Sequence, residues 1–192
     1  MEGSSPQPRL LRVLWVLLAL LVALLAGLLI WQLLGGGDED NPVETTEEAS
    51  GAPRVVSVEE LREAAGSSEV PVYWIGPQDG AELELSEVGE VRVFVRYLTG
   101  GAEAGDPKPA FLAIGAYRLP NAVAALKANA KRTGAELRKA PRGAFAWQDP
   151  DSPTSVYVAR PGEAFQVEVY DPDPKRALST ALSPRLRPVA GG

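Results

Sequence analysis

The chain has 192 residues, with 19 Lys or Arg against 25 Asp or Glu, which gives a formal net charge of −6 at pH 7. A nucleic acid is not an expected partner, because binding to phosphates requires a basic surface. His and Cys are both absent, which excludes Ser-His-Asp triads, cysteine nucleophiles, His- or thiolate-ligated zinc and disulfides.

The first predicted element is an apolar run at residues 13–34, which holds 22 residues and no charged side chain. As a helix it is about 33 Å long, enough to cross a bilayer core of about 30 Å. Arg9 and Arg12 precede the run and acidic residues 38–40 follow it, which predicts a cytoplasmic tail at residues 1–12 and an extracytoplasmic remainder. A cleaved signal peptide is the alternative, but its apolar region is usually shorter. We therefore expect a retained single-pass anchor in the cell membrane.

Three small residues, Ala19, Ala23 and Gly27, recur every four positions within this run. Such a stripe lets two transmembrane helices approach closely, so it is a candidate contact for a homodimer or a membrane partner. A span made mostly of Leu and Ala also produces this spacing by chance, and that alternative stays open.

Residues 35–54 read as an acidic flexible linker, with six acidic side chains, one basic side chain and almost no apolar ones. Such a segment cannot bury enough surface to offset the entropy of ordering. Twenty flexible residues span about 25 Å on average, so the linker would act as a tether. The remaining residues, 55–192, have the size of one domain.

The first half of this domain predicts one helix and four strands. Ser57 and Glu60 have the spacing of a capping box, and the short helix that they begin should end at Gly66. Strands are expected at residues 70–75, 83–86, 91–98 and 111–117, separated by Gly- and Pro-rich turns. The third alternates apolar and polar side chains, as a half-buried strand does. The fourth lacks that alternation, so we expect it to be covered on both faces.

In the second half, Pro120 is suited to a first helical position, and a helix is predicted to follow over residues 121–133 and to end at Gly134. Strands should follow at residues 144–147, 155–159 and 165–170, the last two joined as a hairpin. Asp173 and Pro174 then begin a final helix that runs to about residue 182. This order predicts an α+β domain, with a mostly antiparallel sheet and helices packed on one face.

Two groups of charged residues are candidate binding surfaces. Six cations lie within residues 127–142 and are opposed only by Glu136: Lys127, Lys131, Arg132, Arg138, Lys139 and Arg142. They would suit an anionic polymer or an acidic partner, although a solvated helix face has the same pattern. On the outer face of the sheet, Arg92 and Arg96 would stand near Glu168 and Tyr157, where either a ligand carboxylate or cross-strand pairing would engage them.

Weaker patterns involve carboxylates and aromatic rings. Two Asp-Pro-Asp sequences, at residues 149–151 and 171–173, suggest oxygen-rich cation sites, but the rest of a calcium loop is missing and Asp with Pro also makes turns. Six aromatic residues would line a groove or fill the core: Tyr73, Trp74, Phe111, Phe145, Trp147 and Phe165. We assign no catalytic residue, no metal site and no cofactor.

Four stretches of the chain carry a resemblance: VPVYWIGP, VRVFVRYL, GDPKPAFLAIGAY and VYVARPGEAFQVEVYDP. Together they resemble a group of uncharacterised single-pass, membrane-anchored proteins of high-GC actinobacteria, over about residues 55–190. The resemblance implies the same anchored topology and a shared small domain in a bacterial envelope. It implies no activity and no functional residue.

These observations favour a membrane-anchored, extracytoplasmic domain that binds another macromolecule, as an accessory part of a cell-envelope complex. Its partners would be the membrane that it spans and another envelope protein or an anionic polymer. A hydrolase or lyase that uses carboxylates and Lys is the second hypothesis, and it requires two carboxylates within about 10 Å and a shifted pKa. The third is a structural protein that associates through its transmembrane helix.

Overall fold

The computed structural model describes residues 51–190. The predicted tail, the anchor with Ala19, Ala23 and Gly27, and the linker up to residue 50 lie outside the described residues. Among residues 51–190, no helix combines the length and the apolar character that crossing a membrane requires.

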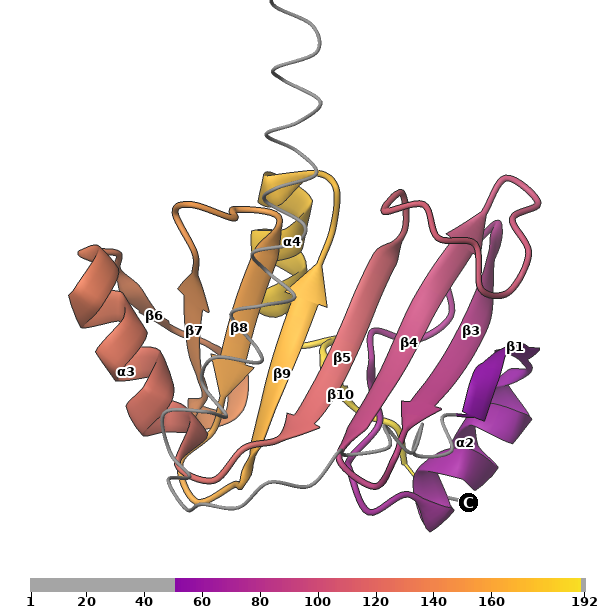
Figure 1. Cartoon of the computed structure of the whole chain (residues 1–192), viewed down its shortest axis with the longest axis horizontal. Coiled ribbons are helices and arrows are strands. Elements are labelled where there is room, and N and C mark those ends of the chain that lie inside the picture. Colours follow the sequence, from indigo (N-terminus) through magenta and orange to yellow (C-terminus); the bar gives the residue numbers. More distant parts are fainter. Residues whose placement is uncertain (1–50, 191–192) are drawn as a thin grey trace, which may run out of the picture. The chain divides into compact units, whose positions relative to one another are not determined.

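One antiparallel sheet of eight strands, in the order β1-β3-β4-β5-β9-β8-β7-β6, forms the centre of the domain (Figure 1). Its strands are β1 (Gly51–Val56), β3 (Ala81–Val88), β4 (Arg92–Thr99), β5 (Leu112–Arg118), β6 (Leu137–Lys139), β7 (Phe145–Gln148), β8 (Ser155–Ala159) and β9 (Phe165–Tyr170). The short strands β2 (Tyr73–Trp74) and β10 (Arg187–Pro188) pair separately. The helices are α2 (Val58–Ser67), α3 (Ala122–Thr133), α4 (Pro174–Ala181) and the 3₁₀ turn η1 (Pro141–Gly143). This architecture confirms the predicted α+β class with a mostly antiparallel sheet.

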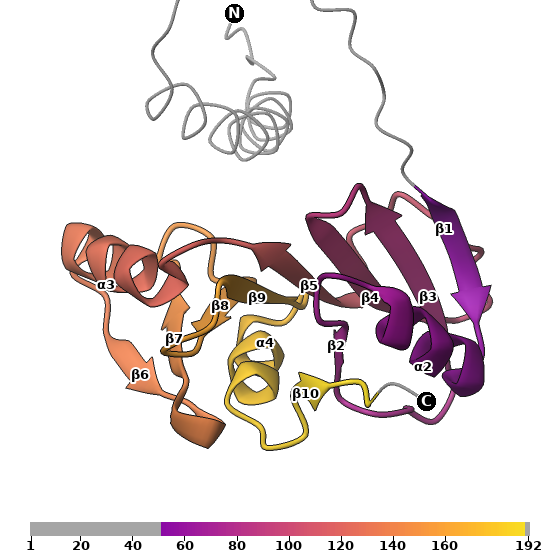
Figure 2. The same ribbon diagram turned by 90° about the horizontal axis from the view of Figure 1, so that it is seen from below.

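The helices lie on both sides of the sheet, so the prediction that they share one face is wrong. One face is covered by α2, the β2–β10 pair and α4, whereas α3 packs on the other face over β6, β7 and β8 (Figure 2). The reason is visible in β8, where Val156 and Val158 join the core beneath α4 while Tyr157 and Ala159 pack towards α3. A strand that is apolar on both faces needs a layer on each side.

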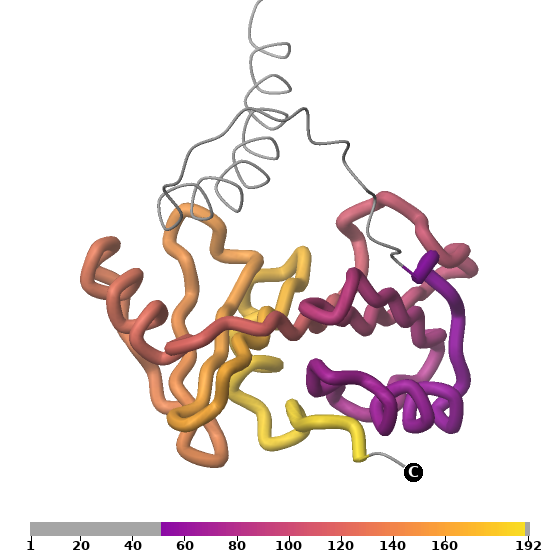
Figure 3. The backbone as a smooth tube through the Cα atoms, turned by 60° about the horizontal axis from the view of Figure 1, so that its bottom comes forward, coloured from indigo at the N-terminus to yellow at the C-terminus, as the bar shows by residue number. Residues whose placement is uncertain are grey.

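The chain runs out across the sheet and then returns. Figure 3 shows it passing from the indigo β1 edge to the orange α3–β6 edge, then back through the yellow C-terminal segment to the neighbourhood of α2. The backbone N–H of Val189 donates to the carbonyl of Val72 at 2.7 Å, which fixes this return. On the opposite face, α3 packs over β6, β7 and β8, and within the described residues no other helix covers that face. We call the remainder of that face, over β3, β4, β5 and β9, the open face.

The helix boundaries follow local signals closely. The capping box is present, because Ser57 Oγ accepts from the Glu60 N–H and the Glu60 carboxylate accepts from the Ser57 N–H. Helix α2 nevertheless continues past Gly66 to Ser67, whose hydroxyl donates to main-chain carbonyls one turn earlier. Helix α4 begins at Pro174 after an Asp173 cap, as predicted.

Helix α3 begins differently from the prediction. Its N-cap is Asn121, which has a left-handed backbone (φ 61°), so Pro120 precedes the helix instead of opening it. Asn tolerates this conformation better than most residues do. The helix ends at the left-handed Gly134, as the sequence predicts.

Strands β8 and β9 have their predicted bounds, and β3, β4, β5 and β7 lie within a few residues of theirs. The segment predicted as a strand at residues 70–75 forms only β2, because it leaves the main sheet to pair with β10. Strands β1, β6 and β10 were not predicted, and β1 begins at Gly51, inside the predicted linker. They are edge strands or short strands without a clear alternation of polarity.

Among residues 51–190, no second layer covers the outward face of β5, the fourth predicted strand. Ile114 and Ala116 join the core, whereas Ala113, Gly115 and Tyr117 lie on the open face. The missing alternation reflects small outward residues. Gly115 is buried by a neighbouring side chain and not by a helix.

Candidate functional site

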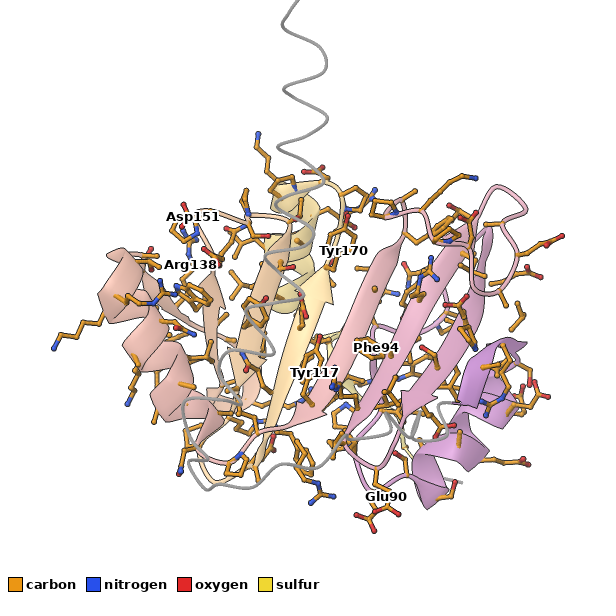
Figure 4. All side chains as sticks on the ribbon, viewed as in Figure 1. Glu90, Phe94, Tyr117, Arg138, Asp151 and Tyr170 are labelled. Carbon is orange, nitrogen blue, oxygen red and sulfur yellow. The ribbon has the colours of Figure 1, made fainter. Side chains whose placement is uncertain are left out.

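The centre of the open face is an aromatic pair over a glycine. Phe94 of β4 lies beside Gly115 of β5, so close that a Cβ on Gly115 would stand 2.8 Å from two atoms of the Phe94 ring. The ring meets the Tyr117 ring edge to face, with centroids 5.7 Å apart. Figure 4 shows Phe94 and Tyr117 side by side on this face. Glycine is therefore required here by the close approach of an aromatic ring.

A carboxylate holds the aromatic pair on its other side. Glu168 of β9 accepts hydrogen bonds from the Tyr117 hydroxyl and from Ser155 Oγ, the latter at 2.7 Å. Burial, followed by the negative charge of Glu168, raises the pKa of Tyr117 and that of the neighbouring Tyr157. Both phenols therefore stay protonated at neutral pH. The cluster presents fixed donors and acceptors and not an activated phenolate.

A second cluster fastens the β4–β5 loop over the open face. Glu84 of β3 is 1% exposed, and its carboxylate accepts from Arg96 at 2.9 Å and from the Gly105 N–H at 2.6 Å. Arg96 also donates to the carbonyl of Asp106 at 2.7 Å and lies over the Phe111 ring, 5.1 Å from its centroid. Such partners offset the free-energy cost of burying a carboxylate. The pair thus fixes the loop to the sheet.

An open hollow of about 340 Å³ lies between this loop and the sheet. Its floor includes Ala113, which stands between Arg96 and Tyr170 in the strand register. Three aromatic rings and three prolines border it: Phe94, Phe111, Tyr170, Pro53, Pro107 and Pro109. The Tyr170 hydroxyl donates to the Pro109 carbonyl at 2.8 Å. The hollow exists because β5 has the small Ala113 where the neighbouring strands β4 and β9 carry the large side chains of Arg96 and Tyr170.

The structure keeps together only two of the four residues that the sequence grouped on the outer face. Glu168 and Tyr157 are directly opposite each other on β9 and β8. Arg92 faces Tyr117, and Arg96 pairs with Glu84 and not with Glu168. The carboxylate of Glu168 is engaged by hydroxyl groups instead. The arginines therefore do not form one carboxylate-binding cluster with Glu168 and Tyr157.

The predicted basic cluster is divided between two places. Five of its residues lie on α3 and β6, at the edge of the sheet farthest from β1: Lys127, Lys131, Arg132, Arg138 and Lys139. Lys127 lies over the Phe145 ring, 5.4 Å from its centroid, and Arg138 pairs with Glu136 at 3.5 Å. The sixth, Arg142, turns away and donates to the carbonyls of Leu186 and Pro184. It fastens the C-terminal segment to η1.

The two Asp-Pro-Asp sequences make turns and caps. Asp149 accepts from the Asp151 N–H, and Asp171 accepts from the Asp173 N–H and from Arg176. No group of three potential metal ligands occurs among residues 51–190. Of the six aromatic residues, Phe111 alone lines the hollow.

Sequence reasoning missed Glu84, Gly115, Tyr117 and Ser155. One signal was available, because a glycine inside a strand often marks the close approach of another group. The burial of Glu84 had no local signal, since its partners come from β4 and from the loop that follows β4.

Comparisons with known proteins give no relative: no family model matches the chain, and neither a curated protein nor a solved structure matches it.

Proposed function

We propose that this chain is a membrane-anchored, extracytoplasmic binding module of a cell-envelope complex, and that its hollow receives an extended segment of another envelope protein. The observation that carries this proposal is the preformed hollow on the open face, whose aromatic walls are held in place by the Glu84–Arg96 pair and the Glu168 cluster. Binding sites are typically such preformed concavities with a few fixed polar groups.

The lining of the hollow favours an extended peptide as its occupant. The two cations at the hollow, Arg96 and Lys108, are each paired with a carboxylate, so a small charged ligand gains little there. Aromatic and proline side chains dominate the remaining border. Aromatic-lined grooves bind proline-rich extended segments, whose conformation is already ordered before binding.

The anchored, extracytoplasmic location is supported by the apolar run at residues 13–34 and by the Arg residues that precede it. We expect the chain to remain in the membrane fraction after a high-salt wash. A C-terminal tag should be cleaved by protease added to intact spheroplasts. Recovery of the chain in the culture supernatant would contradict the anchor.

Site-specific photo-crosslinking in intact cells tests the hollow. Probes at Ser86 and Lys108, which line it, should give the same adduct, and a probe at Ala128, exposed on α3, should not. Ala113→Trp should fill the hollow and abolish the adduct, whereas Ala128→Trp should leave it intact. The partner identified from the adduct should then bind the purified chain at least about tenfold more weakly after Ala113→Trp. An adduct that forms equally from Ala128, or that survives Ala113→Trp, would refute the assignment.

A further inference from the structure

The described domain is electrically polarised along its sheet. Residues 51–106, which build α2, β1, β3 and β4, carry four cations and eleven carboxylates. Residues 122–139, which build α3 and β6, carry five cations and one carboxylate. The two edge strands are seven strand spacings apart, or about 34 Å. This exceeds the Debye length of about 8 Å at physiological ionic strength, so the two ends do not neutralise each other.

Three cations at the basic end form what we call the lysine ridge: Lys127, Lys131 and Lys139. Lys127 and Lys131 are one turn apart on α3, and Lys139 is the strand partner of Phe145, the ring that Lys127 covers. Helix α3 contains no acidic residue. Among the described residues, none of the three lysines has a carboxylate partner. Like charges four residues apart destabilise a helix, and the contact of Lys127 with Phe145 and the place of Lys131 in the last turn of α3 offset part of that cost.

The lysine ridge lies at the edge of the sheet opposite the strand that begins the described domain. The described domain begins at Gly51 in β1, which lies at one edge of the sheet, and the ridge lies at the opposite edge. A domain tethered through β1 therefore presents the ridge at the side remote from its attachment. Lys ammonium groups bind phosphates as compact point charges.

We infer that the lysine ridge binds a phosphate-bearing anionic polymer of the cell envelope. The lysine ridge shares no residue with the hollow. The choice of an envelope polymer rests on the proposed extracytoplasmic location. Binding is electrostatic and falls as salt rises.

The test uses the full chain in nanodiscs of zwitterionic phosphatidylcholine, with a fluorescent synthetic poly(glycerol phosphate) as the probe. K127E/K131E should weaken binding by about tenfold or more at low salt. The matched control, K175E/R187E, makes the same change in net charge at exposed sites on α4 and β10, and it should bind within about twofold of the natural chain. K131Q/K139Q leaves the Lys127–Phe145 contact in place and should weaken binding severalfold without disturbing the fold.

Three results would overturn the inference. The first is no binding of the natural chain at about 0.15 M salt. The second is an equal loss in the ridge variant and its control, which would show an effect of net charge alone. The third is tighter capture of the ridge by nanodiscs that contain anionic phosphatidylglycerol, which would assign it to lipid head groups. None of these results alters the crosslinking expected at the hollow, so the two proposals fail separately.

Discussion

The close approach of Phe94 to Gly115 gives a prediction whose sign is unusual. Alanine is normally favoured over glycine in a strand interior by about 0.5–1 kcal/mol. At position 115 the new methyl group would stand 2.8 Å from two Phe94 ring atoms and 3.0 Å from the Tyr117 hydroxyl. Overpacking of this kind costs about 1–3 kcal/mol, and a displaced ring also loses an aromatic contact worth about 0.5–1.5 kcal/mol. After subtraction of the usual gain from alanine, we expect Gly115→Ala to destabilise the domain by about 2 kcal/mol.

A double-mutant cycle isolates the cause. In a Phe94→Ala background only the Tyr117 hydroxyl stays close to the methyl group, so Gly115→Ala should cost much less, with a coupling free energy of about 2 kcal/mol. Gly51→Ala is the matched control, because its nearest neighbours lie at 4.0 Å. Urea unfolding can be followed through Trp74 and Trp147 after Trp15 and Trp31 are replaced by Phe. Equal effects of Gly115→Ala in both backgrounds would refute the proposed contact.

Three further substitutions test the clusters and caps. Glu84→Gln should destabilise the domain by about 3 kcal/mol, because it leaves the Arg96 guanidinium without its carboxylate. Hydrogen exchange in loop residues 100–111 should become faster. Exchange no faster than in a Ser86→Ala control would contradict this. Burial raises the pKa of Tyr97 to about 12. The unfolded state therefore deprotonates first, and the free energy of unfolding should fall from about pH 10 to about pH 12. Tyr97→Phe should make this fall with pH less steep, and an unchanged pH dependence would show that other groups cause it. Ser57→Ala should destabilise α2 by about 1 kcal/mol, measured by amide exchange in that helix, and a loss confined to other elements would argue against the capping box.

The reliability of the sequence predictions depended on how far apart the interacting residues lie. The caps at Ser57 and Asp173 and the stop at Gly134 were predicted because each involves groups within one or two turns. The β8–β9 hairpin was predicted because a short turn joins its two alternating strands. The short edge strands were missed because three residues such as those of β6 contain too little pattern.

The candidate site was less accessible to sequence reasoning. The cluster at Glu168 depends on the pairing of β5 with β9, which brings Tyr117 to a residue 51 positions away. The sequence grouped Arg96 with that carboxylate, whereas the fold pairs it with Glu84 from the neighbouring strand. The order of strands in the sheet determines which residues an outward-facing side chain contacts, and the local sequence pattern does not show that order.

By itself, the sequence determined most of the longer helices and strands, the α+β class, the absence of His and Cys chemistry and the concentration of cations at residues 127–142. These properties depend on composition or on neighbours along the chain. Only the tertiary structure decided that α3 packs on the face opposite α4, that Ala113 floors a hollow, and that Lys127, Lys131 and Lys139 gather at one edge while Arg142 turns away. The physical reason is that sheet order and layer packing bring together residues far apart in the sequence, and their side chains then determine which charges are paired and which stay exposed.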